Sequence, residues 1–359
     1  MQNLSQTHIL LGKVKRGGDP YWYKIVELLK HVLLLGRTGA GKTTLIYWII
    51  AQLIGKCGIW IIDRKGDFRH LSRIFPGQIL VFDPLKNFYC NPPQPVPYYD
   101  AKKWTGVLTQ FYCKVFNFLD VGRGIMFREL NRLNESRGIY SGGTDYPSFF
   151  DLVEAIEVMR VNPYSNIARS RDSLASRIRT LLDMTGDLCN CSVGFSLEDL
   201  LDKVVVFEFD GVMDDVTNFM TNYLLHWLFC YRIGKGERGN VLRNVVVFDE
   251  ARTVFPVFDN PQIGYASVLN MVQVLREFGV AIIAADSTAQ LHNILYGNTA
   301  LKVLMPLGSG DDLLKAARAM GLSPDQAQAS HGLGVGEAIV RDHRVNKVFV
   351  LEIPKFPLE

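Results

Sequence analysis

The feature that most constrains this chain is a glycine-rich run that ends in lysine and threonine. It has the spacing GxxxxGK[ST], and its residues are Gly36, Arg37, Thr38, Gly39, Ala40, Gly41, Lys42 and Thr43. An apolar run over residues 31–35 precedes it, and residues 42–53 have the length and composition of a helix. A strand, a glycine-rich turn and a helix in this order form the P-loop arrangement, which predicts an α/β fold around it.

This turn predicts a site for the phosphates of ATP. Glycines allow main-chain N–H groups to close round a phosphate, and the start of the helix adds a favourable dipole. We expect Lys42 to reach the β- and γ-phosphates and the Thr43 hydroxyl to bind Mg²⁺. A tight turn that binds no nucleotide is the alternative. The candidate nucleotide-binding residues are Gly36, Arg37, Thr38, Gly39, Ala40, Gly41, Lys42, Thr43 and Thr44.

Two carboxylates follow another apolar run, over residues 245–248. This chemistry needs an acid at the end of a second buried strand, and we expect Asp249 to bind the Mg²⁺. Glu250 comes next and would orient and deprotonate the attacking water. A glutamate in this place favours hydrolysis over transfer of the phosphate to another substrate. The alternative is a strand end capped by two solvated acids.

The pattern of strands and helices predicts the fold class. Apolar, β-branched runs bounded by turn residues lie at 58–62, 78–82, 203–209, 245–248, 280–284 and 301–305, and helical patterns separate several of them. Parallel neighbours need long crossovers, and these supply helices that cover both faces of a sheet. We therefore predict an α/β fold with a mostly parallel sheet.

The middle of the chain departs from this alternation. Residues 104–119, 124–137, 147–159 and 166–182 read as helices with no convincing strand between them. We predict an all-helical insertion over residues 97–200, between a first part of the core with an N-terminal arm (1–96) and a second part (201–359). The glycines and proline before residue 30 suggest a small hairpin or arm, and residues 336–353 read as a two-stranded ending that turns at 342–346.

Composition limits the partners and the compartment. The 359 residues include 39 Lys plus Arg and 36 Asp plus Glu, a net charge of +3, so any contact with nucleic acid must be local. The 6 cysteines have no CxxC spacing, which favours reduced thiols in a cytoplasm. The apolar stretches 44–54 and 216–233 are too short, or too interrupted by polar residues, to span a bilayer. We expect a cytoplasmic protein without a membrane segment of its own.

Several further stretches, taken with the P-loop and its acids, resemble the HerA/FtsK superfamily of ring-forming, DNA-pumping ATPases. Residues 61–67 resemble its D-x-x-G-[DE] element, and Phe82-Asp83-Pro84 with Asn91-Pro92 resembles its N-P element. Residues 287–291 with Tyr296-Gly297 are similar to the S-x-x-Q-L…Y-G run of conjugative coupling proteins, and residues 336–341 resemble the C-terminal strand of the family. The resemblance implies a RecA-like core, ATP bound between neighbouring subunits of a homo-hexamer, and translocation of double-stranded DNA through the central channel.

The resemblance also shows two departures. Relatives commonly place Gln beside the γ-phosphate after the 280–284 strand, whereas this chain has Asp286 there. A carboxylate would repel the phosphate, so either Asp286 acts differently or Gln290 has the sensing role. The second departure is that coupling proteins generally carry an N-terminal membrane segment, which this chain does not show. That favours a HerA-like motor or a coupling-type motor anchored by another subunit.

A ring ATPase also needs a cation from the neighbouring subunit and cations along its DNA path. Arg341, Arg344, Lys315 and Arg318 are unranked candidates for the first role. Two basic stretches are candidates for DNA contacts: one surrounds a glycine-rich loop, and the other lies on a helix of the insertion. The resemblance to the family makes the segment 252–264 a further candidate, as a pore loop. The two stretches comprise Arg232, Lys235, Arg238 and Arg243, and Arg169, Arg171, Arg177 and Arg179.

The main hypothesis is thus an ATP-hydrolysing ring motor that moves double-stranded DNA. The first alternative is a ring ATPase that acts on proteins, or organises a nuclease, defence, secretion or conjugation partner, without gripping DNA. The second is a monomeric nucleotide switch. A superfamily-two helicase is suggested by residues 249–252, which resemble a DEAH box, but a downstream Q-x-x-G-R-x-x-R motif is missing. The sequence does not distinguish repair, conjugation, packaging and defence, because these differ in partners rather than in the core.

Overall fold

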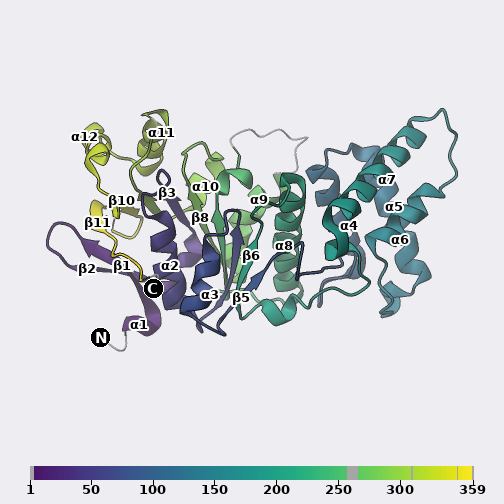
Figure 1. The fold of residues 1–359 in the computed structure, drawn as a ribbon, viewed down its shortest axis with the longest axis horizontal. Coiled ribbons are helices and arrows are strands. Elements are labelled where there is room, and N and C mark those ends of the chain that lie inside the picture. Colours follow the sequence, from purple (N-terminus) through teal and green to yellow (C-terminus); the bar gives the residue numbers. More distant parts are fainter. Residues whose placement is uncertain (1–3, 257–265, 309, 346, 358–359) are drawn as a thin grey trace.

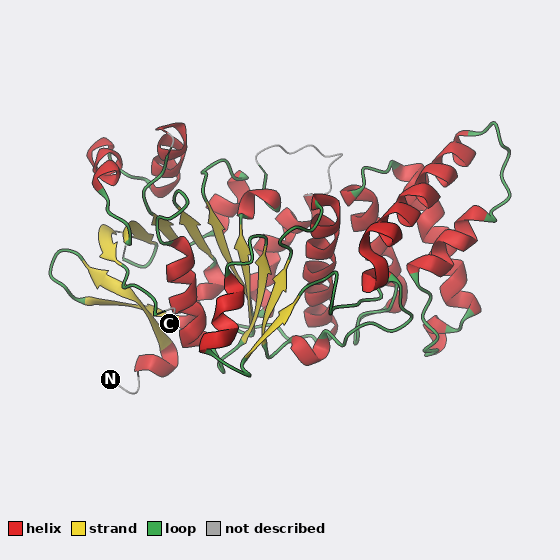
Figure 2. Ribbon diagram, viewed as in Figure 1, coloured by secondary structure: helices red, strands yellow, loops and turns green. Residues whose placement is uncertain are grey.

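One sheet of eleven strands forms the centre of the protein (Figures 1 and 2). The computed structural model describes residues 4–256, 266–308, 310–345 and 347–357. The strand order is β2-β1-β11-β10-β9-β3-β8-β7-β4-β6-β5. The strands are β1 (His8–Val14), β2 (Pro20–Lys24), β3 (Val32–Leu35), β4 (Gly58–Asp63), β5 (Ile79–Phe82), β6 (Val204–Glu208), β7 (Asn244–Asp249), β8 (Val280–Asp286), β9 (Leu301–Leu304), β10 (Glu337–Asp342) and β11 (Lys347–Glu352).

The seven strands from β9 to β5 run parallel to one another. Their residues alternate between two apolar layers: in β7, Val245 and Val247 belong to one core cluster, and Val246 and Phe248 belong to the other. A parallel sheet buried on both faces needs such continuous apolar runs, which is why these strands were recognisable in the sequence. The predicted α/β class with a mostly parallel sheet is confirmed.

Antiparallel strands extend this sheet on one side. β10 pairs with β9 and with β11, and β11 pairs with β1, which pairs with β2. Both hairpins were expected, at residues 336–353 and near the N-terminus. It was not expected that both hairpins would join the central sheet, because local sequence patterns do not specify which distant strand an edge strand will pair with.

Helices cover both faces of the sheet. On one face lie α2 (Lys42–Leu53) and α3 (Leu71–Ile74), whose apolar side chains share a core cluster with β3 and β4. On the other face lie α8 (Asp214–Gly234) and α9 (Ala266–Leu275). Most of α8 is buried because it contacts both the sheet and the helices beyond it. None of the helices, within the residues that the structure describes, has the length and apolar character to cross a membrane.

Four helices lie together at one end of the molecule, on the right of Figure 1. They pack on one another and on α8, and their side chains belong to the same core cluster as one face of the sheet. For example, Phe111 and Phe149 both contact Phe219 of α8. The helical region therefore shares its core with the sheet. Its helices are α4 (Ala101–Val115), α5 (Asp120–Ser136), α6 (Phe149–Glu157) and α7 (Asn166–Thr185).

The remaining helices lie near the ends of β8, β9 and β10. They are α10 (Asn293–Asn298), α11 (Gly310–Met320) and α12 (Pro324–Ala329), and α1 (Leu4–Thr7) precedes the first strand. α11 and α12 stand above the sheet in Figure 1, whereas the N mark lies at the lower left, beside α1. The carboxyl ends of the parallel strands thus meet the loops and helices in which the functional residues were predicted.

Candidate nucleotide-binding site

The P-loop connects β3 to α2 at the carboxyl edge of the sheet. Gly36 follows β3 directly, and a Cβ built on it would lie 2.7 Å from Cβ of Met305. Gly41 has φ 108°, a left-handed conformation that a residue with a side chain adopts only with strain. The two glycines therefore permit a turn that is tight against the end of β9. Arg37, Thr38 and Gly39 are exposed, Ala40 is buried, and Thr43 and Thr44 are half-buried on the first turn of α2.

Lys42 is buried at the base of this turn. Its Nζ donates hydrogen bonds to the carbonyl oxygens of Gly36, at 2.5 Å, and Arg37, at 3.2 Å. Burial lowers the pKa of Lys42, while the negative charge of Asp249 opposes the shift. An ammonium group bonded to two neutral carbonyls can exchange these for phosphate oxygens, which form stronger charge-assisted hydrogen bonds.

Asp249 ends β7 and is 4% exposed. Its Oδ2 is buried and has no hydrogen-bond partner among the described residues. Burial raises the pKa of this carboxyl, and the cation of Lys65 opposes the shift. A buried carboxylate oxygen without a partner is costly unless a ligand completes it, so Asp249 fits the Mg²⁺ that the P-loop chemistry uses. The Thr43 hydroxyl is the second candidate ligand on this chain.

Glu250 occupies a turn with an unusual backbone. Its φ is 64°, in the left-handed region that residues other than glycine seldom adopt. Its Oε1 lies 2.9 Å from Nζ of Lys65 and 3.8 Å from Nη2 of Arg252. Burial would raise the pKa of Glu250, but the hydrogen bond and charge of Lys65 bring it below its ordinary value. Glu250 is therefore a carboxylate, able to accept a hydrogen bond from water at neutral pH.

Lys65 is a contact residue that the sequence did not single out. It follows β4, the neighbour of β7, in a turn closed by Asp63, whose carboxylate accepts the N–H groups of Lys65, Gly66 and Phe68 at 3.1, 3.0 and 2.9 Å. Burial raises the pKa of Asp63 to about 6. The D-x-x-G-[DE] element thus builds a rigid turn beside Glu250. Only the adjacency of β4 and β7, which the sequence does not show, brings Lys65 to Glu250.

The two residues considered for phosphate sensing lie in different surroundings. Asp286 ends β8 and is 1% exposed, and its carboxylate accepts the N–H groups of Arg252 at 2.6 Å and Thr288 at 3.0 Å. Burial raises its pKa, and these two main-chain bonds oppose the shift. Gln290 is exposed, and its Nε2 lies 3.3 Å from Oδ1 of Asp312, a buried acid on α11 that the sequence did not single out.

The candidates for a cation that acts on a neighbouring subunit also differ. Arg344 forms an ion pair with Asp342 at 2.5 Å, and its guanidinium lies 4.3 Å from the centre of the Tyr23 ring. Arg341 stands on β10 opposite Lys302 of β9. These two candidates thus belong to the antiparallel extension of the sheet.

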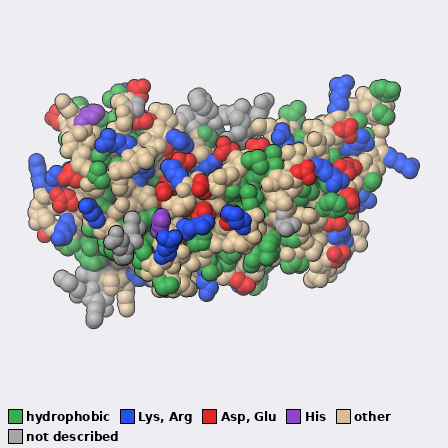
Figure 3. Space-filling view, in the orientation of Figure 1, with side chains coloured by type: hydrophobic (Ala, Val, Ile, Leu, Met, Phe, Trp, Pro, Cys, Tyr) green, Lys and Arg blue, Asp and Glu red, His purple; other side chains and the backbone are tan. Residues whose placement is uncertain are grey.

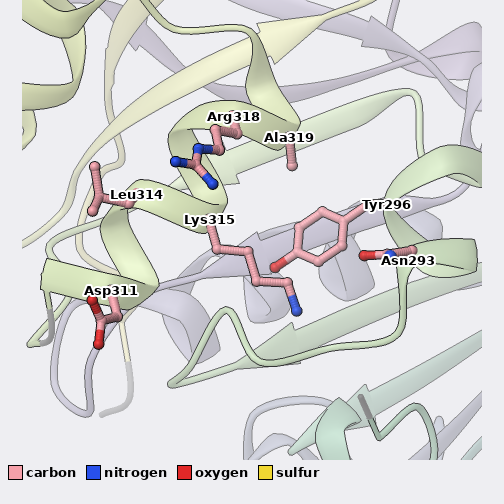
Figure 4. A pocket seen from close by; sticks show the side chains of 7 residues that line it. All are labelled: Asn293, Tyr296, Asp311, Leu314, Lys315, Arg318 and Ala319. Atoms are coloured by element: carbon pink, nitrogen blue, oxygen red, sulfur yellow. The ribbon is translucent and has the colours of Figure 1, made fainter. Parts of the chain in front are cut away.

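Lys315 and Arg318 lie on α11 and line a pocket of about 760 Å³. Tyr296 lies across from Lys315 in this pocket (Figure 4). Lys315 donates a hydrogen bond to the carbonyl oxygen of Leu291 at 2.9 Å, whereas the side chain of Arg318 is exposed. α11 therefore presents one cation engaged with the loop after β8 and one at the surface.

The basic stretches predicted to contact DNA are largely paired within the chain. Arg232 and Arg243 both approach Glu237, Arg238 lies 3.6 Å from Glu277, and Nζ of Lys235 lies 4.0 Å from the centre of the Tyr98 ring. On α7, Arg171, Arg177 and Arg179 approach Asp172, Asp215 and Glu157, and Arg169 is exposed. Cations and carboxylates are interspersed over the face shown in Figure 3. Of the predicted pore loop, residues 257–264 lie outside the described residues.

Comparison with solved structures shows the same fold over nearly the whole chain. VirB4 of Thermoanaerobacter pseudethanolicus has 17% sequence identity and a TM-score of 0.72, with 98% of each chain covered. The conjugative coupling protein TrwB, in a complex with ADP and Mg²⁺, has 14% identity and a TM-score of 0.64, over 99% of this chain and 92% of that chain. No curated protein matches the sequence significantly.

Strand order and P-loop geometry, together with these folds, define the class of the protein: it is a P-loop ATPase with a RecA-like core. Residues 11–227, more than half of the chain, match the model of the family described as the central domain of the helicase HerA. The chain therefore belongs to the HerA family. The resemblance to the HerA/FtsK superfamily and the ATPase activity predicted from the sequence are confirmed.

Proposed function

We propose that this protein is a ring motor that hydrolyses ATP to translocate double-stranded DNA. The observation that carries the proposal is the carboxyl edge of the sheet, where the charge of the P-loop lysine acts on Asp249 and Glu250 and where Oδ2 of Asp249 is buried with no hydrogen-bond partner among the described residues. Membership of the HerA family supports DNA as the substrate. We place the motor in the cytoplasm, where ATP and DNA occur together, as a homo-hexamer with ATP between neighbouring subunits.

Each residue of the site has a role in this proposal. Main-chain N–H groups of the P-loop hold the phosphates, and Lys42 exchanges its two carbonyl partners for β- and γ-phosphate oxygens. The Thr43 hydroxyl and Asp249 would hold Mg²⁺, which neutralises charge that develops on the phosphates. Glu250 accepts a proton from the attacking water while Lys65 holds its carboxylate from the adjacent strand.

A cation from the neighbouring subunit completes the site. Arg341, Arg344, Lys315 and Arg318 remain the candidates, and of these Arg318 has an exposed side chain beside an open pocket. Arg344 would have to leave both Asp342 and the ring of Tyr23. We therefore propose Arg318 as the first candidate to test. An arginine that stabilises transition-state charge in trans is worth about 10³ to 10⁵ in rate, so its loss would be easy to measure.

A ring that acts on proteins, or that organises a nuclease, secretion or conjugation partner, is the second candidate. The observation that favours it is the pairing of the predicted DNA-binding cations with acids or aromatic rings of the same chain. Several of these pairs are exposed, however, and exposed ion pairs contribute only about 0 to 1 kcal/mol. DNA phosphates can therefore compete for their arginines, and the first candidate is retained.

Sedimentation of the Glu250→Gln variant with ATP and Mg²⁺ tests the proposal. The variant should bind ATP without hydrolysing it, assemble into a hexamer and sediment with linear duplex DNA at low salt. Counterion release predicts that this binding falls steeply as salt increases. Lys42→Ala is the matched control, since it removes nucleotide binding and should remove assembly. A hexamer that ignores DNA at low salt would support the second candidate, and a monomer in every condition would contradict a ring.

A further inference from the structure

Asp286 stands at the centre of the site. Its strand, β8, lies between the P-loop strand β3 and the acidic strand β7. Asp286 is opposite Leu35 in the register with β3, and its carbonyl oxygen accepts the N–H of Gly36 at 3.1 Å. Because it ends the strand between them, Asp286 can contact the loops that follow both neighbours.

The carboxylate of Asp286 joins two loops. One oxygen, Oδ2, accepts the N–H of Arg252 at 2.6 Å, in the turn that follows β7. The other, Oδ1, accepts the N–H of Thr288 at 3.0 Å, in the loop that follows β8. Both oxygens thus have main-chain partners, and Asp286 is buried. This arrangement differs from that of a side chain directed at a γ-phosphate.

The turn that carries Glu250 combines local hydrogen bonds with a strained backbone. The carbonyl oxygen of Glu250 accepts two hydrogen bonds from Thr253, one from its N–H at 3.1 Å and one from its side-chain hydroxyl at 2.9 Å. These bonds close the turn locally. Glu250 nevertheless has φ 64°, which costs about 1 kcal/mol or more for a residue with a side chain. Such a conformation persists only when surrounding contacts hold it, and the bond from Arg252 to Asp286 lies two residues away.

We propose that Asp286 is a positioning residue for ATP hydrolysis. By holding the N–H of Arg252 it fixes the turn after β7, and so directs the carboxylate of Glu250 toward the attacking water. An amide at this position offers only one acceptor oxygen, so it cannot hold both N–H groups in the same way. The inference rests on the proposed role of Glu250 as the base, and it assigns Asp286 an action through Glu250 rather than contact with phosphate.

The test is Asp286→Asn, with steady-state ATPase measured without DNA and ATP binding measured separately. We expect kcat to fall about 10- to 100-fold, because a buried N–H loses its partner and the turn loosens, while the Kd for ATP changes less than about threefold. Amide exchange over residues 250–254 should accelerate. If Asp286 instead faced the γ-phosphate, removal of its charge would tighten ATP binding and leave exchange at Arg252 unchanged, and that result would overturn the proposal.

Asp312→Asn is the matched control. Asp312 is a buried acid on α11 that accepts the N–H of Ala289 at 2.9 Å and the hydroxyl of Thr288 at 2.7 Å, so it anchors the loop after β8. Among the residues that the structure describes, its side-chain hydrogen bonds go to that loop and not to the turn of Glu250. We expect its kcat to stay within about threefold of wild type. An equal loss of kcat in both variants would show that general loosening of the loop after β8 is responsible. That result would contradict a positioning role for Asp286.

Two measurements keep the outcome clear. In wild type, the amide of Arg252 should exchange slowly, and exchange at the rate of an unbonded amide would overturn the proposal even if Asp286→Asn failed to fold. Glu250→Gln in the same assay separates the two assignments. Normal turnover by the Glu250→Gln variant would contradict the role of Glu250 as the base, and this proposal with it. Slow turnover by Glu250→Gln together with normal turnover by Asp286→Asn would overturn the positioning role alone.

Discussion

Two polar residues at the carboxyl end of the parallel strands, Lys42 and Asp249, differ in their hydrogen bonding from the buried polar residues at the amino end. At the amino end, His31 has Nε2 at 2.8 Å from the carbonyl oxygen of Val272, and its Nδ1 accepts the N–H of Ile282 at 3.1 Å. Arg232 is buried there, bonded to Asn244 and paired with Glu237. At the carboxyl end, the hydrogen bonds of Lys42 Nζ within the described part of the chain go to carbonyl oxygens, and Asp249 keeps a buried oxygen without a partner there.

This difference separates stability from chemistry. Satisfied polar groups at the amino end contribute to folding and have little capacity left for a ligand. Incompletely satisfied groups at the carboxyl end cost stability, and a ligand that completes them recovers that cost as binding energy. Ligands generally bind at the carboxyl ends of parallel strands in open α/β sheets. In this protein the incompletely satisfied groups of Lys42 and Asp249 give a physical reason for a ligand to bind there.

The largest effect is expected at Glu250. Glu250→Gln keeps the size of the side chain but removes the base, so kcat should fall about 10²- to 10⁴-fold with ATP still bound. The measurement is steady-state phosphate release beside equilibrium ATP binding. Unchanged turnover would mean that a different group accepts the proton. The carboxyl end would then differ from the amino end in hydrogen bonding but not in the catalytic role assigned to Glu250.

Lys42→Ala should abolish tight nucleotide binding. The loss of charge-assisted hydrogen bonds to the phosphates predicts a Kd for ATP about 10³-fold weaker, measured by calorimetry with Mg²⁺ present. Because the hydrogen bonds of Lys42 Nζ among the described residues go to P-loop carbonyls, the melting temperature without nucleotide should change little. A large fall in that melting temperature would show that this end of the sheet also depends on its polar groups for stability.

At the amino end, acid should destabilise the protein through His31. Burial lowers the pKa of His31 to about 4, while an unfolded histidine titrates near about 6.5. The neutral ring therefore contributes stability that is complete above about pH 6.5 and is lost as the pH falls through about 4, by up to about 3 kcal/mol. Urea denaturation across this range measures the effect.

His31→Asn sharpens this prediction. Asparagine also offers one acceptor and one donor group and tolerates positive φ, which is 61° at this position, but it does not titrate. The variant should lose part of the pH dependence, and the rest should persist because burial also lowers the pKa of His226 to about 4. His331→Gln, at an exposed site, is the control. An unchanged pH dependence in His31→Asn would contradict the assignment.

The smallest effect is expected for Arg238, an exposed arginine at the amino end. Arg238 lies 3.6 Å from Glu277 in an exposed pair, so Arg238→Ala should change the free energy of unfolding by less than about 0.5 kcal/mol. If this end takes no part in DNA binding, the salt dependence of duplex binding should stay the same. A decrease in the salt slope by about 1 would indicate a lost phosphate contact and would give the amino end a function.

The sequence predicted the parts of the site that are local in the chain. The P-loop, Asp249 and Glu250 lie within short motifs, and the parallel strands form continuous apolar runs, so both were visible without a structure. The contacts of Lys65 with Glu250 and of Asp286 with Arg252 were not, because each joins segments brought together by the strand order. The partners of the basic residues were hidden for the same reason, since Arg179 meets Glu157 only where α6 and α7 pack together.

The central claim, that ATP hydrolysis by this protein is coupled to DNA, is tested most directly by the ATPase rate of wild type and Glu250→Gln, with and without linear duplex DNA, across a salt series. The account predicts that duplex DNA stimulates wild-type turnover, that the stimulation fades as salt rises, and that it is absent in Glu250→Gln. Glu250-dependent turnover that is indifferent to duplex DNA even at low salt would contradict a DNA motor and favour a ring that acts on proteins.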